Sequence, residues 1–94
     1  NDAQLADLTL TGATISFSPT TYTYTATASS NSLKIEASPA QAAAQVAISV
    51  NGKNLRNGGT ATLTASTLNP ITVTVTQGNA VRVYTLNITG AAGG

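Results

Sequence analysis

A seven-residue stretch that begins at Tyr22 alternates strictly between two kinds of residue, and this pattern constrains the fold more than any other feature. Tyr22, Tyr24, Ala26 and Ala28 share one parity, and three threonines occupy the other. A period of two places these sets on opposite faces of an extended strand, which can then bury one face against a core. We therefore predict a strand over residues 21–28.

The same alternation recurs along most of the chain, with aliphatic residues in place of the tyrosines. The inward rows that it predicts are Leu8/Leu10, Ile15/Phe17, Leu33/Ile35/Ala37, Val46/Ile48/Val50, Ala61/Leu63/Ala65, Ile71/Val73/Val75 and Tyr84/Leu86/Ile88. About seven strands at roughly ten-residue spacing, separated by turn residues, are typical of a β-sandwich. The sequence thus predicts an all-β protein, an antiparallel sandwich of the immunoglobulin-like type.

Turn residues mark the boundaries between these strands. Asn51-Gly52 predicts a two-residue type I′ hairpin, because both positions favour positive φ. A strand over residues 13–17 is expected to end at a turn around Pro19, which lacks a backbone donor. The alanine-rich segment 39–45 predicts a loop, with room for one helical turn, since it is too short for a stable helix.

Two valines in the last expected strand do not fit its inward row. Tyr84, Leu86 and Ile88 share one parity, whereas Val81 and Val83 have the other. Either a β-bulge near residues 82–83 changes the register, or the two valines form an outward-facing apolar pair.

The length of 94 residues fits a single domain. We expect residues 5–89 to form the sandwich, residues 1–4 an N-terminal linker, and residues 90–94 a flexible glycine-rich tail.

Several functions are unlikely on composition. Charged residues make up 7% of the chain, and the net charge of +1 forms no basic patch, which argues against nucleic acid as a partner. No apolar run reaches the roughly 18 residues of a membrane-spanning helix, so we expect no membrane insertion. The chain has no cysteine and no histidine, which leaves no thiolate or imidazole ligand for a metal.

The carboxylates are too few to suggest an active site. Asp2, Asp7 and Glu36 are spread along the sequence, and no histidine is present to act as a base. Nucleophilic hydroxyls need an activating neighbour, so we predict that the protein is not an enzyme and has no catalytic residues. Calcium usually requires six to eight oxygen ligands, several from carboxylates, and we therefore expect neither a metal nor another cofactor.

Two sets of residues are candidates for ligand binding. Tyr22 and Tyr24 on one face of a strand could stack against a sugar, although half-buried packing is the commoner role of such a pair. Lys53, Asn54 and Arg56 surround predicted turns and could bind a ligand as polar groups on a loop surface. Turn formation and solubility are the simpler explanations for this second set.

The order of the motifs resembles the bacterial cadherin-like β-sandwich family over about residues 5–89. The resemblance lies in the following segments: Asp7-Leu8-Thr9-Leu10, Gly12-Ala-Thr-Ile15, Phe17-Ser-Pro19, Tyr22, Val46/Ile48/Val50 before Asn51-Gly52, Asn69 before Ile71-Thr-Val-Thr-Val75, and Tyr84-Thr-Leu86-Asn-Ile88. It implies an immunoglobulin-like fold that occurs in tandem in large secreted or surface proteins of bacteria, and in related phage particle proteins.

Three functional hypotheses follow from this resemblance and from the Tyr22/Tyr24 pair. The first is a structural or adhesion module, a spacer or display domain of a bacterial surface or secreted protein whose partners are neighbouring domains. The alternatives are an outward-facing domain of a phage particle and a weak carbohydrate-binding module that contacts a cell-surface glycan or protein. All three imply an extracellular, cell-surface or virion-surface location.

Overall fold

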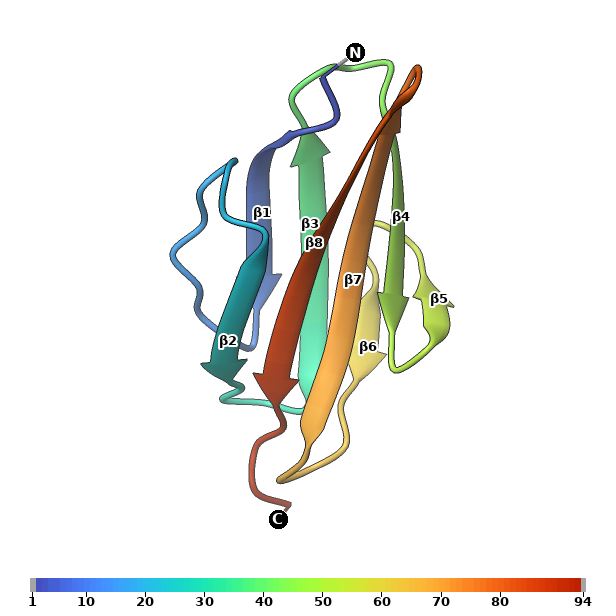
Figure 1. The fold of residues 1–94 in the computed structure, drawn as a ribbon. Coiled ribbons are helices and arrows are strands. Elements are labelled where there is room, and N and C mark those ends of the chain that lie inside the picture. Colours follow the sequence, from blue (N-terminus) through green and yellow to red (C-terminus); the bar gives the residue numbers. More distant parts are fainter. Residues whose placement is uncertain (1, 94) are drawn as a thin grey trace.

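The computed structural model describes residues 2–93 and folds them into two β-sheets packed face to face (Figure 1). No helix occurs among these residues, so the predicted all-β sandwich is confirmed. The strands are β1 (Leu5–Thr11), β2 (Thr23–Thr27), β3 (Ser32–Pro39), β4 (Gln45–Val50), β5 (Lys53–Leu55), β6 (Thr60–Thr62), β7 (Leu68–Gln77) and β8 (Ala80–Thr89).

The two sheets have different widths. The first contains three strands in the order β1-β3-β6, and the second contains five in the order β2-β8-β7-β4-β5. All neighbouring strands are antiparallel except β2 and β8, which pair in parallel from Thr23/Thr85 to Thr27/Thr89. The expectation of a wholly antiparallel sandwich therefore needs this one correction.

The parallel pair results from the path of residues 12–22. We expected a strand over residues 13–17, but this segment contains no strand. Instead, residues 12–22 run back along one side of the sandwich, from the end of β1 toward the end where β1 began (Figure 1). The chain then enters β2 in the same direction as β1 and β8, which makes the β2–β8 pair parallel.

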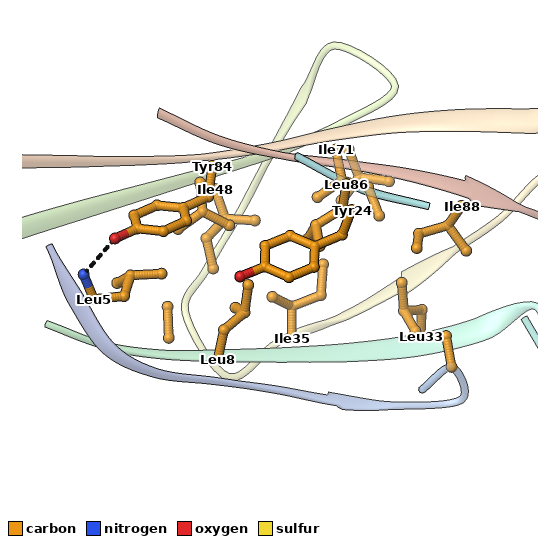
Figure 2. Packing of buried hydrophobic residues seen from close by; sticks show 14 of the residues in the cluster. Leu5, Leu8, Tyr24, Leu33, Ile35, Ile48, Ile71, Tyr84, Leu86 and Ile88 are labelled. Atoms are coloured by element: carbon orange, nitrogen blue, oxygen red, sulfur yellow. Dashed lines mark hydrogen bonds between the residues drawn. The ribbon is translucent and has the colours of Figure 1, made fainter. Parts of the chain in front are cut away.

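The predicted inward rows of β3, β7 and β8 form the centre of the core, whereas the row Ile15/Phe17 is only partly buried. Leu33, Ile35 and Ala37 in β3 are buried, as are the rows of β7 and β8, while Lys34 and Glu36 face solvent. Figure 2 shows these side chains between the sheets. The fully buried apolar and aromatic residues of β7 and β8 are Ile71, Val73, Val75, Tyr84, Leu86 and Ile88, and Asn69 of β7 is fully buried with them.

The alternatives for Val81 and Val83 are resolved by the pairing of β7 and β8. Their register runs without interruption from Leu68/Thr89 to Gln77/Ala80, so no bulge is present. Val81 is 58% exposed and Val83 is 44% exposed, and they form the outward-facing apolar pair.

The predicted turns close the hairpins. Asn51 and Gly52 have φ values of 52° and 80°, as a type I′ turn between β4 and β5 requires. Gly78 and Asn79 connect β7 to β8. In the loop after β3, the Ala44 N–H donates to the Gln41 carbonyl at 3.0 Å, which forms a turn and no helix.

Both ends of the expected sandwich extend further than the sequence indicated. Ala3, placed in the predicted linker, is buried, and the Gln4 carbonyl accepts a hydrogen bond from Ala40. Gly90 and Ala91, placed in the predicted tail, hydrogen-bond to the body of the domain. The described parts of both segments are thus folded, and Asn1 and Gly94 lie outside the described residues.

Candidate functional site

The five residues singled out as ligand contacts lie on opposite lateral sides of the sandwich. Tyr24 belongs to β2, and Tyr22 precedes this strand. Both lie on the side formed by the edge strands β1 and β2. Lys53 and Asn54 belong to β5, and Arg56 follows this strand. They lie on the side formed by the edge strands β5 and β6. The structure therefore does not combine the two sets into one site.

The first side is closed by tyrosine hydroxyls. Tyr24 is buried, and its hydroxyl donates to the Ser18 carbonyl at 2.8 Å and accepts from the Ser18 N–H at 3.0 Å. The hydroxyl of Tyr84, which is fully buried, donates to the Pro19 carbonyl at 2.6 Å and accepts from the Leu5 N–H at 2.9 Å (Figure 2). These bonds fasten residues 18 and 19 over the edge of the core.

Burial also affects the acidity of Tyr84. It raises the pKa of the Tyr84 hydroxyl above its ordinary value, because the phenolate would lose its hydration. The hydrogen bond from the Leu5 N–H acts in the opposite direction but does not cancel this effect. The neutral hydroxyl, which can both donate and accept, is therefore the stable form.

The aromatic rings on this side pack on one another. The ring centroids of Tyr22 and Tyr84 are 5.1 Å apart, and those of Phe17 and Tyr24 are 6.1 Å apart. The Arg82 guanidinium lies 5.4 Å from the centre of the half-buried Tyr22 ring. Phe17, expected in the core, is only partly buried. Tyr22 and Tyr24 thus do not form a pair of exposed rings on which a sugar could stack.

The opposite side is open. A groove of about 390 Å³ lies there between the edge strands β5 and β6, within the size range of small-ligand sites. Its apolar lining comes from Val50, Leu55 and Ala61, and its polar lining from Asn51, Lys53, Asn54, Thr62 and Thr64. Two of the predicted polar residues, Lys53 and Asn54, therefore line this groove, whereas Arg56 does not.

Two asparagine side chains border the open side, one at each end. The Asn57 carboxamide accepts from the Ala37 N–H at 2.9 Å and donates to the Ala37 carbonyl at 2.8 Å. The Asn69 carboxamide accepts from the Thr64 N–H at 2.8 Å and donates to the Thr64 carbonyl at 3.1 Å. A carboxamide carries donors and an acceptor in one plane, so each side chain takes the place of a neighbouring strand at one residue.

Asn69 makes further bonds that the sequence analysis did not anticipate. It is fully buried, donates to the carbonyls of Thr67 and Ile88, and accepts from the side chain of Asn51 at 2.8 Å. Its position offered a signal, because Asn69 shares the parity of the inward row Ile71/Val73/Val75. A polar residue in an apolar row must find partners inside the protein.

The carboxylates make only local contacts. Asp2 accepts from the Gln4 N–H, Asp7 accepts from the Leu8 N–H, and Glu36 lies 3.8 Å from the ammonium of Lys34. Within residues 2–93, no group of three or more acidic, histidine or cysteine side chains could hold a metal ion. The described residues offer to a ligand hydrogen bonds, the groove between β5 and β6 and a smaller hollow beside β1.

The two sheets and their topology define an immunoglobulin-like β-sandwich module. A scan against family models matches residues 5–90 to the cadherin-like beta sandwich domain. The chain therefore belongs to the cadherin-like β-sandwich family, as its motifs predicted. No curated protein matches the sequence. The described residues also contain no helix long and apolar enough to cross a membrane.

Proposed function

We propose that this chain is a non-catalytic spacer module that holds neighbouring domains apart in a bacterial surface or secreted protein. The observation that carries the proposal is where the chain enters and leaves the sandwich. It enters β1 and leaves β8 at opposite ends of an elongated body whose longest dimension is 44 Å (Figure 1). Domains attached before and after such a module would be separated by its full length.

The exit from the sandwich is firmly held, as a spacer requires. The Asn31 carboxamide accepts from the Ala91 N–H at 2.8 Å and donates to the Ala91 carbonyl at 3.1 Å. Gly90 lies so close to Thr64 that a side chain at this position would collide with the Thr64 carbonyl group. These contacts fix the direction in which the chain leaves the domain.

The segment that enters β1, at the other end of the molecule, is also held by hydrogen bonds. The Leu5 N–H donates to the Tyr84 hydroxyl, and Gln4 accepts from Ala40. Because both ends are tied to the core by hydrogen bonds, bending between linked modules would occur outside residues 4–91. The surface or secreted location is supported by the resemblance of the motifs to bacterial modules of this kind.

A tandem protein tests the spacer function. Two copies of residues 1–94 are joined directly, and the maximum dimension is measured by small-angle X-ray scattering beside a single copy. We expect the second copy to add about 44 Å. Two copies that fold back side by side, with little gain in length, would contradict the proposal.

A matched variant separates rigidity from length. Asn31→Ala removes both hydrogen bonds to Ala91, and Ser32→Ala, at a neighbouring exposed residue, serves as the control. We expect the Asn31 variant of the tandem protein to show a broader distribution of distances between spin labels on the two copies. Location is tested separately: labelling of the full-length protein on intact cells, or its recovery from the medium, supports it, and confinement to the cytoplasm contradicts it.

A further inference from the structure

The free edge of β6 directs backbone hydrogen-bonding groups toward the groove. The Leu63 N–H donates to the Asn31 carbonyl, the Ile35 N–H donates to the Gly59 carbonyl, and the register pairs Leu33 with Ala61. In an antiparallel ladder, bonded and non-bonded pairs alternate along each strand. Residues 59, 61 and 63 therefore face β3, and Thr60 and Thr62 direct their N–H and C=O groups away from the sheet.

This free edge is short and has defined ends. At its lower end, the Asn69 carboxamide already occupies the outward backbone groups of Thr64. At its other end, β6 begins at Thr60, directly after Gly59, whose N–H donates to the Arg56 carbonyl in a turn. Within residues 2–93, the outward backbone groups of Thr60 and Thr62 have no such partner. An exposed edge of this kind is a template for an added strand.

The charges around the groove indicate which kind of peptide could add to β6 as a further strand. Lys53 lines the groove, and Arg56 follows β5 in the link to β6. Within the described part of the chain, neither cation makes a salt bridge, and no carboxylate lines the groove. Glu36, in the neighbouring strand β3, is paired with Lys34. The groove lining thus carries the positive charge of Lys53 and no carboxylate.

We propose that the open side binds an extended, acidic peptide segment of a partner protein, which adds as a strand along Thr60–Thr62. Strand addition derives its affinity from backbone hydrogen bonds, and alternate side chains provide the specificity. Inward side chains of the peptide would contact Leu55 and Ala61 in the groove, and its carboxylates would lie near Lys53. A sugar is disfavoured, because no aromatic ring lines the groove.

Peptide titrations followed by ¹⁵N NMR test the proposal. The probe is acetyl-Glu-Val-Thr-Val-Thr-Glu-amide, and its controls are the same peptide with lysine in place of glutamate and the same peptide N-methylated at alternate residues. We expect the acidic peptide to shift the amide signals of Thr60, Thr62 and Leu55 and to bind at least about tenfold more tightly than either control. Equal binding of all three peptides would overturn the proposal.

A charge reversal in the protein provides the second test. Lys53→Glu should weaken binding of the acidic peptide about tenfold at low salt, and the difference should shrink as salt is raised. Arg82→Glu, an equal charge change on the closed side beside Tyr22, should leave binding unchanged if Lys53 acts locally. Equal loss in both variants, or saturable binding of cellohexaose or oligogalacturonate with shifts at the same residues, would contradict a peptide site.

Discussion

The core of this sandwich is covered in different ways at its two lateral sides. Each side is formed by one edge strand from each sheet, and the core between these two strands must be covered there. The edge strands are β1 and β2 on one side, and β5 and β6 on the other. On the first side, residues 12–22 cross the gap and are held by the hydroxyls of Tyr24 and Tyr84. On the second side, two three-residue strands leave a groove between them.

The difference shows that a loop can close a β-sandwich without forming a strand, provided that buried side chains supply its hydrogen bonds. Tyr84 does this from within the core, where its ring also fills space against Phe17 and Tyr22. The open side has asparagine clamps only at its ends, where Asn57 and Asn69 pair with backbone groups. The closed side is therefore covered by its own chain, whereas on the open side the outward backbone groups of Thr60 and Thr62 have no partner within residues 2–93.

The largest effect is expected where the open side is anchored, at Asn69. Asn69→Ala would leave the backbone groups of Thr64, Thr67 and Ile88 without their partner in a buried place. We expect a loss of about 3–5 kcal/mol of unfolding free energy, measured by urea denaturation. Asn54→Ala, an exposed asparagine on the same side, should change stability by less than about 0.5 kcal/mol. Similar effects of the two variants would show that the Asn69 hydrogen bonds contribute little.

The closed side should respond next, through Tyr84. Tyr84→Phe removes the acceptor of the buried Leu5 N–H and the donor to the Pro19 carbonyl, and we expect a loss of about 2–3 kcal/mol. The control is Tyr22→Phe, because the Tyr22 hydroxyl makes no side-chain hydrogen bond within residues 2–93. If both variants unfold at the wild-type urea midpoint, hydroxyl anchoring of residues 18–19 is not what closes this side.

Phe17→Ala should reduce the unfolding free energy by less than the expected place of Phe17 in the core would imply. Complete burial would make Phe17→Ala cost about 3–5 kcal/mol. Phe17 is only partly buried and contacts the rings of Tyr24 and Tyr84 from the edge of the core, so we expect about 1–2 kcal/mol by thermal or urea denaturation. A loss as large as that of Asn69→Ala would mean that the closed side depends on the ring more than on the hydroxyls.

The pH dependence of stability reports on the Tyr84 hydroxyl of the closed side in the wild-type protein. Because the pKa of Tyr84 is raised in the folded protein, the unfolded chain loses this proton first as pH rises. The contribution of Tyr84 is therefore complete below the ordinary tyrosine pKa of about 10 and declines above it. Urea midpoints at pH 8 and pH 10.5 should fall more steeply for the wild type than for Tyr84→Phe. Equal slopes would contradict this prediction.

The smallest effect on stability is expected at the groove itself. Lys53 is exposed and makes no salt bridge among the described residues, so Lys53→Ala should change the unfolding free energy by less than about 0.5 kcal/mol. Such a result would separate a binding role from a structural one. A loss above about 1 kcal/mol would show that Lys53 supports the fold.

Much of the fold followed from local pattern. The two-residue period identified the inward rows of β3, β7 and β8, and Asn51-Gly52 identified its hairpin, because strand faces and tight turns depend on residues close in sequence. Part of the candidate site followed as well, since Lys53 and Asn54 flank that hairpin and line the groove. Arg56 does not line it, and the Tyr22/Tyr24 pair lies on the other side.

The sequence by itself determined that this chain forms layered sheets with aliphatic inward rows and without histidine or cysteine chemistry. Only the tertiary structure decided which side of the sandwich is closed. That outcome depends on bonds between residues far apart in the chain, such as Leu5 with Tyr84 and Asn31 with Ala91. No local period encodes such pairs, because they form only once the two sheets have brought their partners together.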